Sequence, residues 1–412
     1  MKSIITLLFF QLLFAPLFSQ QTGCTDPRAN NFNPQATQND GSCTYNITVY
    51  NPPVRYILPD EVDETSGLIF YMGGYWTIND SGGLPVIYKL DTLTGSVIQR
   101  ITVSNATNVD WEDITQDNEH IFVGDFGNNS GNRDDLCIYI VDKSTIPATG
   151  DIAVNSKKIS FSYEDYPGHV EKRKYNNFDC EAFLSAGDSL YLFSKDWEDG
   201  HTRMYTLPKT AGNYTAKVLY RFNSAGLITG ADFNKENNEV VLVGYTNKRW
   251  VPFLWILFDF KGYNFFSGNK RRIDMPNVTA TQTEGIAYVN GKRGVISSEG
   301  RVFFSQTMFD FSTAQWTDKA YAGIPRPVDT ALFLSIYPNP LKKSKLHVKI
   351  NGNVKNTFTL AVLDTSGRLV FAQKYPAGKR KIKLKFNNIV KGTYIIKLTV
   401  GKKSYKKKFV KL

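Results

Sequence analysis

The sequence predicts an all-β protein: a β-propeller of five or six four-stranded blades, followed by a small antiparallel β-sandwich. Strand-like apolar runs recur over residues 51–323 with a period of roughly 45 to 70 residues. No long stretch places apolar residues at the helical period of about 3.6. From residue 335 onward, lysine or threonine alternates with apolar residues, which is typical of strands with one buried face.

Five units make up the predicted propeller, and each begins with a similar segment that holds an acidic residue. These segments are residues 64–68, 111–114, 180–183, 229–233 and 283–287. Second strands are expected at 70–78, 120–123, 189–193, 239–243 and 294–297, and third strands at 86–90, 136–140, 202–207, 253–257 and 302–304. Outer strands are expected at 97–103, 158–163 and 217–222. Four strands per unit favour a propeller, with a solenoid or a sandwich as the alternatives.

Two further segments bear on how the ring closes. A strand expected at 54–58 could pair with the last unit, which would leave no long sheet edge. The long stretch 147–177 could contain a sixth, degenerate blade, so the sequence leaves five and six blades open.

The charge of the chain is distributed unevenly. The 412 residues carry a formal net charge of +11, but residues 341–412 hold 20 Lys and Arg against one acid. The first 340 residues therefore hold 29 basic and 37 acidic residues, so the predicted propeller is acidic. This distribution argues against nucleic acid as a partner.

The N-terminus predicts export. A basic Lys2 precedes a mostly apolar run that ends near Phe18, which is typical of a signal peptide over residues 1–19. The run is interrupted and shorter than the roughly 20 apolar residues that a membrane-spanning helix needs.

The next segment, residues 20–50, contains two of the four cysteines. Cys24 and Cys43 enclose a stretch rich in Asp, Asn, Gly and Pro, and in an exported protein they predict a disulfide. The stretch resembles a small module that recurs in exported bacterial proteins. Its oxygen-bearing side chains could bind calcium, or the module could be a turn-rich knot without an ion. Cys137 and Cys180 are expected to be buried free thiols.

Acidic residues recur where the first strand of each unit begins. Glu112, Glu181 and Glu284 hold corresponding positions, and Asp110 and Asp179 precede two of them by two residues. First strands line the axis of a propeller, so these carboxylates should converge, repel one another and favour a divalent cation. Calcium suits a site made of oxygen ligands, whereas the four histidines show no metal-ligand spacing.

A second polar set follows the second strands. We expect ligand-binding residues there: Asp80, Asp125, Asn128 and Glu299. Asp and Asn beside Gly also form ordinary tight turns, which is the alternative for each position taken alone. The sequence leaves open whether the two sets lie at the same mouth of the ring.

Parts of two units resemble known propellers. Residues 111–114 with 123–129, and 283–288 with 297–300, look like repeats of exported bacterial propellers related to phytase-like esterase domains. The resemblance implies a calcium-dependent propeller that binds or hydrolyses a phosphorylated or ester substrate. The chain has no Gly-x-Ser-x-Gly nucleophile motif, which argues against hydrolysis through a serine.

The last segment follows a proline-containing linker at 324–334 and resembles the C-terminal sorting domain of type IX secretion cargo. The matching residues are 337–340 (YPNP), 364–368 (DTSGR), 392–394 (GTY) and 408–411 (KFVK). The resemblance covers residues 335–412. It implies docking to the type IX machinery and a final location outside the cell or on the outer-membrane surface.

Taken together, these observations predict a secreted or cell-surface propeller that binds a small molecule, glycan or peptide at a channel mouth. Calcium is a possible stabilising ion and no other cofactor is indicated. The alternative is a calcium-dependent hydrolase of phosphoesters, other esters or lactones, with Glu112, Glu181 and Glu284 as metal ligands and Asp110 or Asp179 as base. The sequence does not decide whether the protein is an enzyme.

Overall fold

A computed structural model describes residues 20–170, 175–247, 250–278, 282–300, 304–318 and 333–412, apart from 352–353, 355, 365–366, 387–388 and 402. The predicted signal peptide and residues 324–332 of the predicted linker lie outside these ranges. The chain divides into two compact units, residues 1–322 and 323–412. Both are built of β-strands, and the described residues contain a single short α-helix, α1 (Ala314–Thr317). No helix in the described ranges is long and apolar enough to cross a membrane.

The first unit contains five antiparallel groups of four strands. The first two groups are β5 (Thr65–Tyr71), β6 (Gly74–Asn79), β7 (Val86–Leu90) and β8 (Val97–Val103), then β9 (Trp111–Gln116), β10 (His120–Asp125), β11 (Cys137–Asp142) and β13 (Lys157–Tyr163). The next two are β14 (Cys180–Ala186), β15 (Ser189–Ser194), β16 (Thr202–Pro208) and β17 (Gly212–Phe222), then β18 (Leu227–Asn234), β19 (Glu239–Tyr245), β20 (Pro252–Phe258) and β21 (Asn269–Asp274). The fifth group is β22 (Thr283–Asn290), β23 (Arg293–Ser298), β24 (Thr307–Ser312) and β4 (Val54–Ile57).

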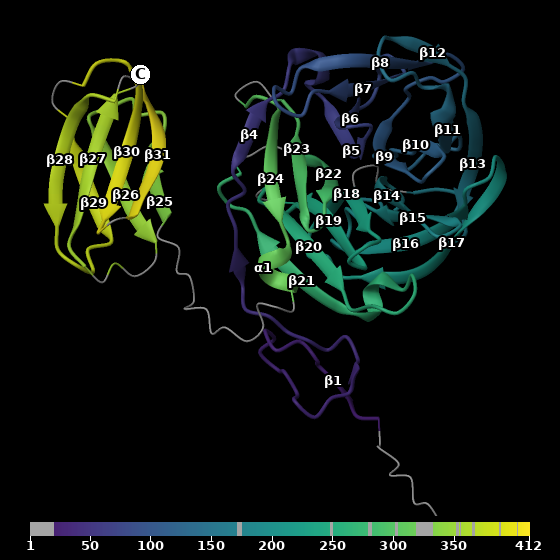
Figure 1. Ribbon diagram of the computed structural model, residues 1–412, viewed down its shortest axis with the longest axis horizontal. Coiled ribbons are helices and arrows are strands. Elements are labelled where there is room, and N and C mark those ends of the chain that lie inside the picture. Colours follow the sequence, from purple (N-terminus) through teal and green to yellow (C-terminus); the bar gives the residue numbers. More distant parts are fainter. Residues whose placement is uncertain are drawn as a thin grey trace, which may run out of the picture. The chain divides into compact units, whose positions relative to one another are not determined.

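The first strands of the groups gather around the centre of this unit (Figure 1). Each contacts the next in the closed order β5, β9, β14, β18, β22 and back to β5. Neighbouring first strands are not paired as a sheet, and polar side chains link them instead. These links run from Ser66 to the Glu112 carbonyl, from the Phe183 N–H to Asp113, from Thr229 to the Thr283 carbonyl, and from the Tyr288 N–H to Asp232.

Apolar side chains fill the space between successive groups. Phe126, which follows β10, packs edge-on against Phe183 of β14 with ring centres 5.1 Å apart. Similar clusters join the remaining neighbouring groups, including the fifth and the first, where Val295 and Leu68 belong to one cluster. Burying one such side chain contributes about 1.5 to 3 kcal/mol to the stability of the fold. Each group is therefore stabilised by packing against both of its neighbours.

Outer strands add further connections. β13 and β17 pair in parallel and join the second and third groups into one eight-stranded sheet. β12 (Ile152–Val154) adds to the edge of β8, and β3 (Thr48–Val49) adds to β21. The stretch 147–177 thus supplies edge strands to the first and second groups.

The predicted strands are largely confirmed. The strand expected at 54–58 is β4, and it pairs with β24 of the fifth group. The prediction was wrong for the third strand of that group: it was placed at 302–304, of which 302 and 303 lie outside the described residues, whereas the observed strand is β24. The apolar run at 302–304 is only three residues long, whereas the run at 307–312 is long enough to pair with the whole of β23.

The segment before the ring is a small knot closed by a disulfide between Cys24 and Cys43. Its polar side chains cap turns, because Asp26 accepts from the Arg28 N–H at 3.0 Å and Asp40 accepts from the Ser42 N–H at 3.0 Å. Cys137 and Cys180 are buried free thiols, as expected.

The second unit consists of two antiparallel sheets. One contains β25 (Phe333–Tyr337), β26 (Lys345–Asn351) and β29 (Lys381–Lys385), and the other contains β28 (Leu369–Tyr375), β27 (Phe358–Asp364), β30 (Gly392–Val400) and β31 (Lys403–Lys411). Their apolar side chains form one core cluster. In β29 the lysines are exposed while Ile382 and Leu384 are buried, as the alternation predicts.

A carboxylate cluster as candidate cation site

The two acidic sets lie at the same end of the first unit. A first strand begins where its antiparallel partner ends: Trp111 of β9 lies opposite Asp125 of β10, and Thr283 of β22 lies opposite Ser298 of β23. The antiparallel pairing therefore shows that both acidic sets lie at the same mouth of the ring, which the sequence left open. We call this side of the ring the acidic end.

Glu112 lies at the centre of the candidate site. Asp80, Asp110 and Glu112 form one group in which an oxygen of each side chain lies within 4.8 Å of the others. Glu112, Asp179 and Glu181 form a second group at the same spacing. The sheet pairing thus brings together four of the five expected metal ligands, with Asp80 from the second set.

Burial makes this arrangement electrostatically unfavourable. Glu112 is 4% exposed, and no donor among the described residues bonds its carboxylate. Burial raises the pKa of Glu112 well above its usual range, and Glu181, Asp80, Asp110 and Asp179 raise it further. Burial likewise raises the pKa of Asp110 to about 7. Such carboxylates need protons, a basic partner or a metal ion at neutral pH.

Lys195 is one such basic partner. It follows β15 directly, its ammonium pairs with the Glu181 carboxylate, and it lies 4.8 Å from the Trp197 ring centre. Burial alone would lower the pKa of Lys195, but Glu181 raises it well above the usual range. The sequence reasoning missed this residue. A comparison of the units could have found it, since Lys195 directly follows β15 as Asp80 directly follows β6.

Glu284, the fifth expected ligand, lies outside the two groups. The Gln282 amide donates to Glu284 Oε1 at 3.0 Å and to Glu299 Oε2 at 3.1 Å. Glu284 Oε2 is buried and has no hydrogen-bond partner within the described ranges. Burial raises the pKa of Glu284 well above its usual range, with Glu299 contributing, and the Glu284 charge in turn raises the pKa of Glu181.

Asp125 and Asn128 hold the loop beside the cluster. Asp125 pairs with Arg133 at 2.9 Å and accepts from the Asp110 N–H at 3.1 Å. The Asn128 side chain accepts from the Arg133 N–H, and its backbone N–H donates to Asp179 Oδ1 at 2.7 Å. These side chains position candidate ligands, and Asp125 belongs to neither of the two groups.

Gly127 provides the space for the cluster. A Cβ at this position would lie 2.1 Å from Glu112 Oε1 and 2.4 Å from Asp110 Oδ2. Only glycine leaves both carboxylates where they are.

The comparison with protein families matches the C-terminal unit. A family model described as a secretion system C-terminal sorting domain covers residues 335–412. These residues form a type IX sorting domain. The protein is therefore exported to the cell surface or the extracellular space, and its sorting domain interacts with the type IX secretion machinery.

The other comparisons leave the first unit unassigned. No curated protein matches the chain. Among solved structures, an exo-β-1,3-galactanase from Phanerochaete chrysosporium is similar at 11% identity and a TM-score of 0.41, covering 91% of this chain and 98% of that one. Kuenenia stuttgartiensis hydrazine synthase is similar at 11% identity and a TM-score of 0.31, covering 84% and 76%. The RS223 β-xylosidase is similar at 13% identity and a TM-score of 0.33, covering 52% and 77%. Likenesses at these scores support no conclusion about fold or function.

Proposed function

We propose that the first unit is a five-bladed β-propeller that binds a divalent cation, with calcium as the best match, in the carboxylate cluster. The cation-bearing end then serves as the binding site for a small molecule, glycan or peptide outside the cell. The observation that carries this proposal is Glu112, a buried carboxylate that belongs to both acidic groups and that no donor in the described ranges satisfies.

Two features support the propeller. The first strands contact one another in a closed order, and apolar clusters join all neighbouring groups. The pairing of β4 with β24 completes the fifth group with a strand from the start of the unit, which is how many propellers close their rings.

Charge and ligand chemistry support the cation. Asp80, Asp110, Glu112, Asp179 and Glu181 supply oxygen ligands, and Lys195 is the basic side chain that pairs with one of them. Calcium accepts six to eight oxygen ligands in a flexible geometry. Asp80 and Asp110 are partly exposed while the other three carboxylates are buried, so a ligand would approach the cation from the side of Asp80 and Asp110.

One observation favours the hydrolase alternative. Asp110 lies at the partly exposed edge of the cluster, so with the cation held by the other carboxylates its own carboxylate could act as the base towards a substrate. In that reaction the cation would polarise the substrate, while Asp110 would take up and return a proton. Turnover of a chromogenic phosphate or ester, abolished by Asp110→Asn, would support hydrolysis over binding alone.

Calcium titration by calorimetry and thermal unfolding tests the cation. At a concentration of 100 Kd, a bound ion stabilises the folded state by about 2.7 kcal/mol, so the melting temperature should rise with calcium and fall with EDTA. Glu112→Gln should abolish this response. Glu236→Gln, which removes an exposed carboxylate elsewhere on the unit, should leave it unchanged. A wild-type protein that is indifferent to both calcium and EDTA would overturn the proposal.

A further inference from the structure

A cavity lies at the end of the first unit opposite the acidic end, where the first strands end. It has a volume of about 700 Å³, and Tyr71, Gln116, Ala186 and Phe233 contribute to it from β5, β9, β14 and β18. Glu112 and Gln116 lie four positions apart in β9, which corresponds to about 13 Å along a strand. The cavity is therefore distinct from the carboxylate cluster.

Lys143 is the buried basic side chain of this cavity, and burial lowers its pKa to about 8, which leaves it mostly protonated at neutral pH. It is only 9% exposed, and its Nζ donates to Gln116 Oε1 at 2.7 Å and to the Asp117 carbonyl at 2.5 Å. The ammonium also lies 4.2 Å from the centre of the Tyr71 ring. An ammonium has three donors, and among the described residues Lys143 has no carboxylate within ion-pair distance. One donor and the positive charge are left for a ligand.

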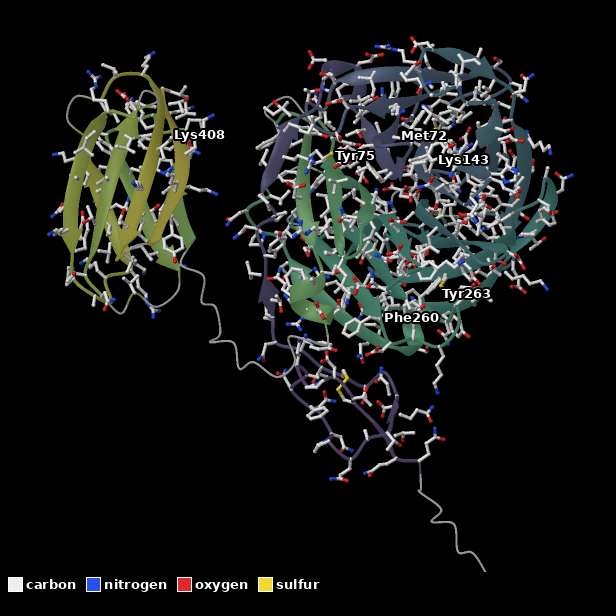
Figure 2. All side chains as sticks on the ribbon, in the orientation of Figure 1. Met72, Tyr75, Lys143, Phe260, Tyr263 and Lys408 are labelled. Atoms are coloured by element: carbon white, nitrogen blue, oxygen red, sulfur yellow. A yellow bond between two sulfur atoms is a disulfide. The ribbon has the colours of Figure 1, made fainter. Side chains whose placement is uncertain are left out.

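The remaining lining adds an aromatic wall but no net charge, because Lys209 and Lys235 are matched in number by Asp117 and Glu119. Lys209 is neutralised by Asp117 at 3.2 Å, whereas Lys235 is exposed and forms no ion pair within the described ranges. Tyr263 is 43% exposed and stands 5.8 Å from Tyr191, ring centre to ring centre. Figure 2 labels Lys143 and Tyr263 on this unit.

Gly187 explains how Tyr263 is held. A Cβ on Gly187 would lie 2.7 Å from the Tyr263 hydroxyl oxygen, so the tyrosine packs directly onto the turn between β14 and β15. A loop of the fourth group thereby forms one wall of the cavity together with Phe233 and Lys235 of the same group, and the other walls belong to the first three groups.

We propose that this cavity binds an acidic saccharide, a sugar ring that carries a carboxylate or a sulfate. The anionic group would bind Lys143, and the ring would lie against Tyr263. Gln116, Asn118 and Ser185 offer both donors and acceptors in the same lining, which matches hydroxyl groups that both donate and accept. The site does not depend on the cation, so it goes beyond the function proposed above.

Calorimetry in EDTA tests the site separately from the acidic end. The secreted protein is titrated with a trimer of glucuronic acid, a sulfated disaccharide, the glucose trimer and inorganic sulfate. We expect an acidic sugar to bind at least tenfold more tightly than the glucose trimer and than sulfate. Lys143→Gln should remove this preference, whereas Lys217→Gln, an exposed lysine on the outer strand β17, should preserve it.

Three results would overturn the inference: no binding of either acidic sugar, equal binding of the glucose trimer or of sulfate, or an unchanged preference in Lys143→Gln. Because Lys143 is buried and its loss could disturb folding, Tyr263→Ala provides a second test at an exposed position. This variant should weaken acidic-sugar binding about tenfold, and unchanged binding would also refute the inference.

Discussion

Gly127→Ala tests the carboxylate cluster without removing any of its charges. The added methyl would lie 2.1 Å from Glu112 Oε1, whereas such contacts essentially never fall below 3.0 Å, so the carboxylate must move by at least 0.9 Å. Ligand distances in metal sites are held to about 0.2 Å. We therefore expect at least a tenfold loss of calcium affinity, equivalent to about 1.4 kcal/mol, measured by calorimetric titration.

Gly83→Ala is the matched control. Gly83 follows β6 at the same end of the unit, and a Cβ there would lie 3.6 Å from its nearest neighbour, an ordinary contact. This variant should bind calcium as the wild type does. If Gly127→Ala folds and retains wild-type calcium affinity, then Glu112 and Asp110 are not cation ligands.

Four further predictions concern stability and export. In EDTA, Asp110→Asn should raise stability at pH 8 by about 2 to 4 kcal/mol in urea unfolding. Burial raises the pKa of Asp110 to about 7, so the folded state binds the proton more tightly than the unfolded state and the protein loses stability as the pH rises from about 4 to 7. If Asp110→Asn were still more stable than the wild type below pH 4, this explanation would be contradicted. Thr229→Val removes the donor to the Thr283 carbonyl and should cost about 1 kcal/mol in the same assay, whereas an unchanged midpoint would show that this link contributes nothing. Replacing Cys24 and Cys43 by serine removes a disulfide between residues 19 positions apart, which contributes about 3 kcal/mol to stability, so proteolysis of the knot should become faster. Equal cleavage rates in the variant and the wild type would argue against a stabilising role for the disulfide. Deleting residues 335–412 should retain the protein in the periplasm on fractionation, and undiminished surface display would contradict its role in sorting.

The strands were predictable because their signal is local. Alternating or continuous apolar runs between turn residues identified nearly every strand of the first unit, and the recurrence of acids at strand ends identified most of the cluster. The antiparallel pairing of first and second strands then determined that both acidic sets share one end. That conclusion required the direction of strand pairing, which residue types alone do not reveal.

The remaining features depend on contacts between groups. Lys195 directly follows a strand, and only its contact with Glu181 reveals its effect on the cluster. The cavity around Lys143 combines segments far apart in the chain, including Tyr263 from the fourth group. Asp125 and Asn128 are predicted to bind a ligand, which stays a prediction, and their bonds to Arg133 and Asp179 show that they also hold the loop beside the cluster. The sequence around a single residue does not distinguish a side chain that binds a ligand from one that supports a loop.

The pairing of β4 with β24 has a consequence for the order of events during export. Ile57 lies opposite Thr307, so residues 250 positions apart must meet before the fifth group is complete. A chain that emerges from its N-terminus presents β4 early and leaves it unpaired until β24 arrives. The ring can close only after residue 312 has emerged, and the sorting domain at 335–412 follows soon afterwards in the chain. Because the sorting domain follows β24 in the chain, the export signal becomes available only after the segment needed to complete the ring.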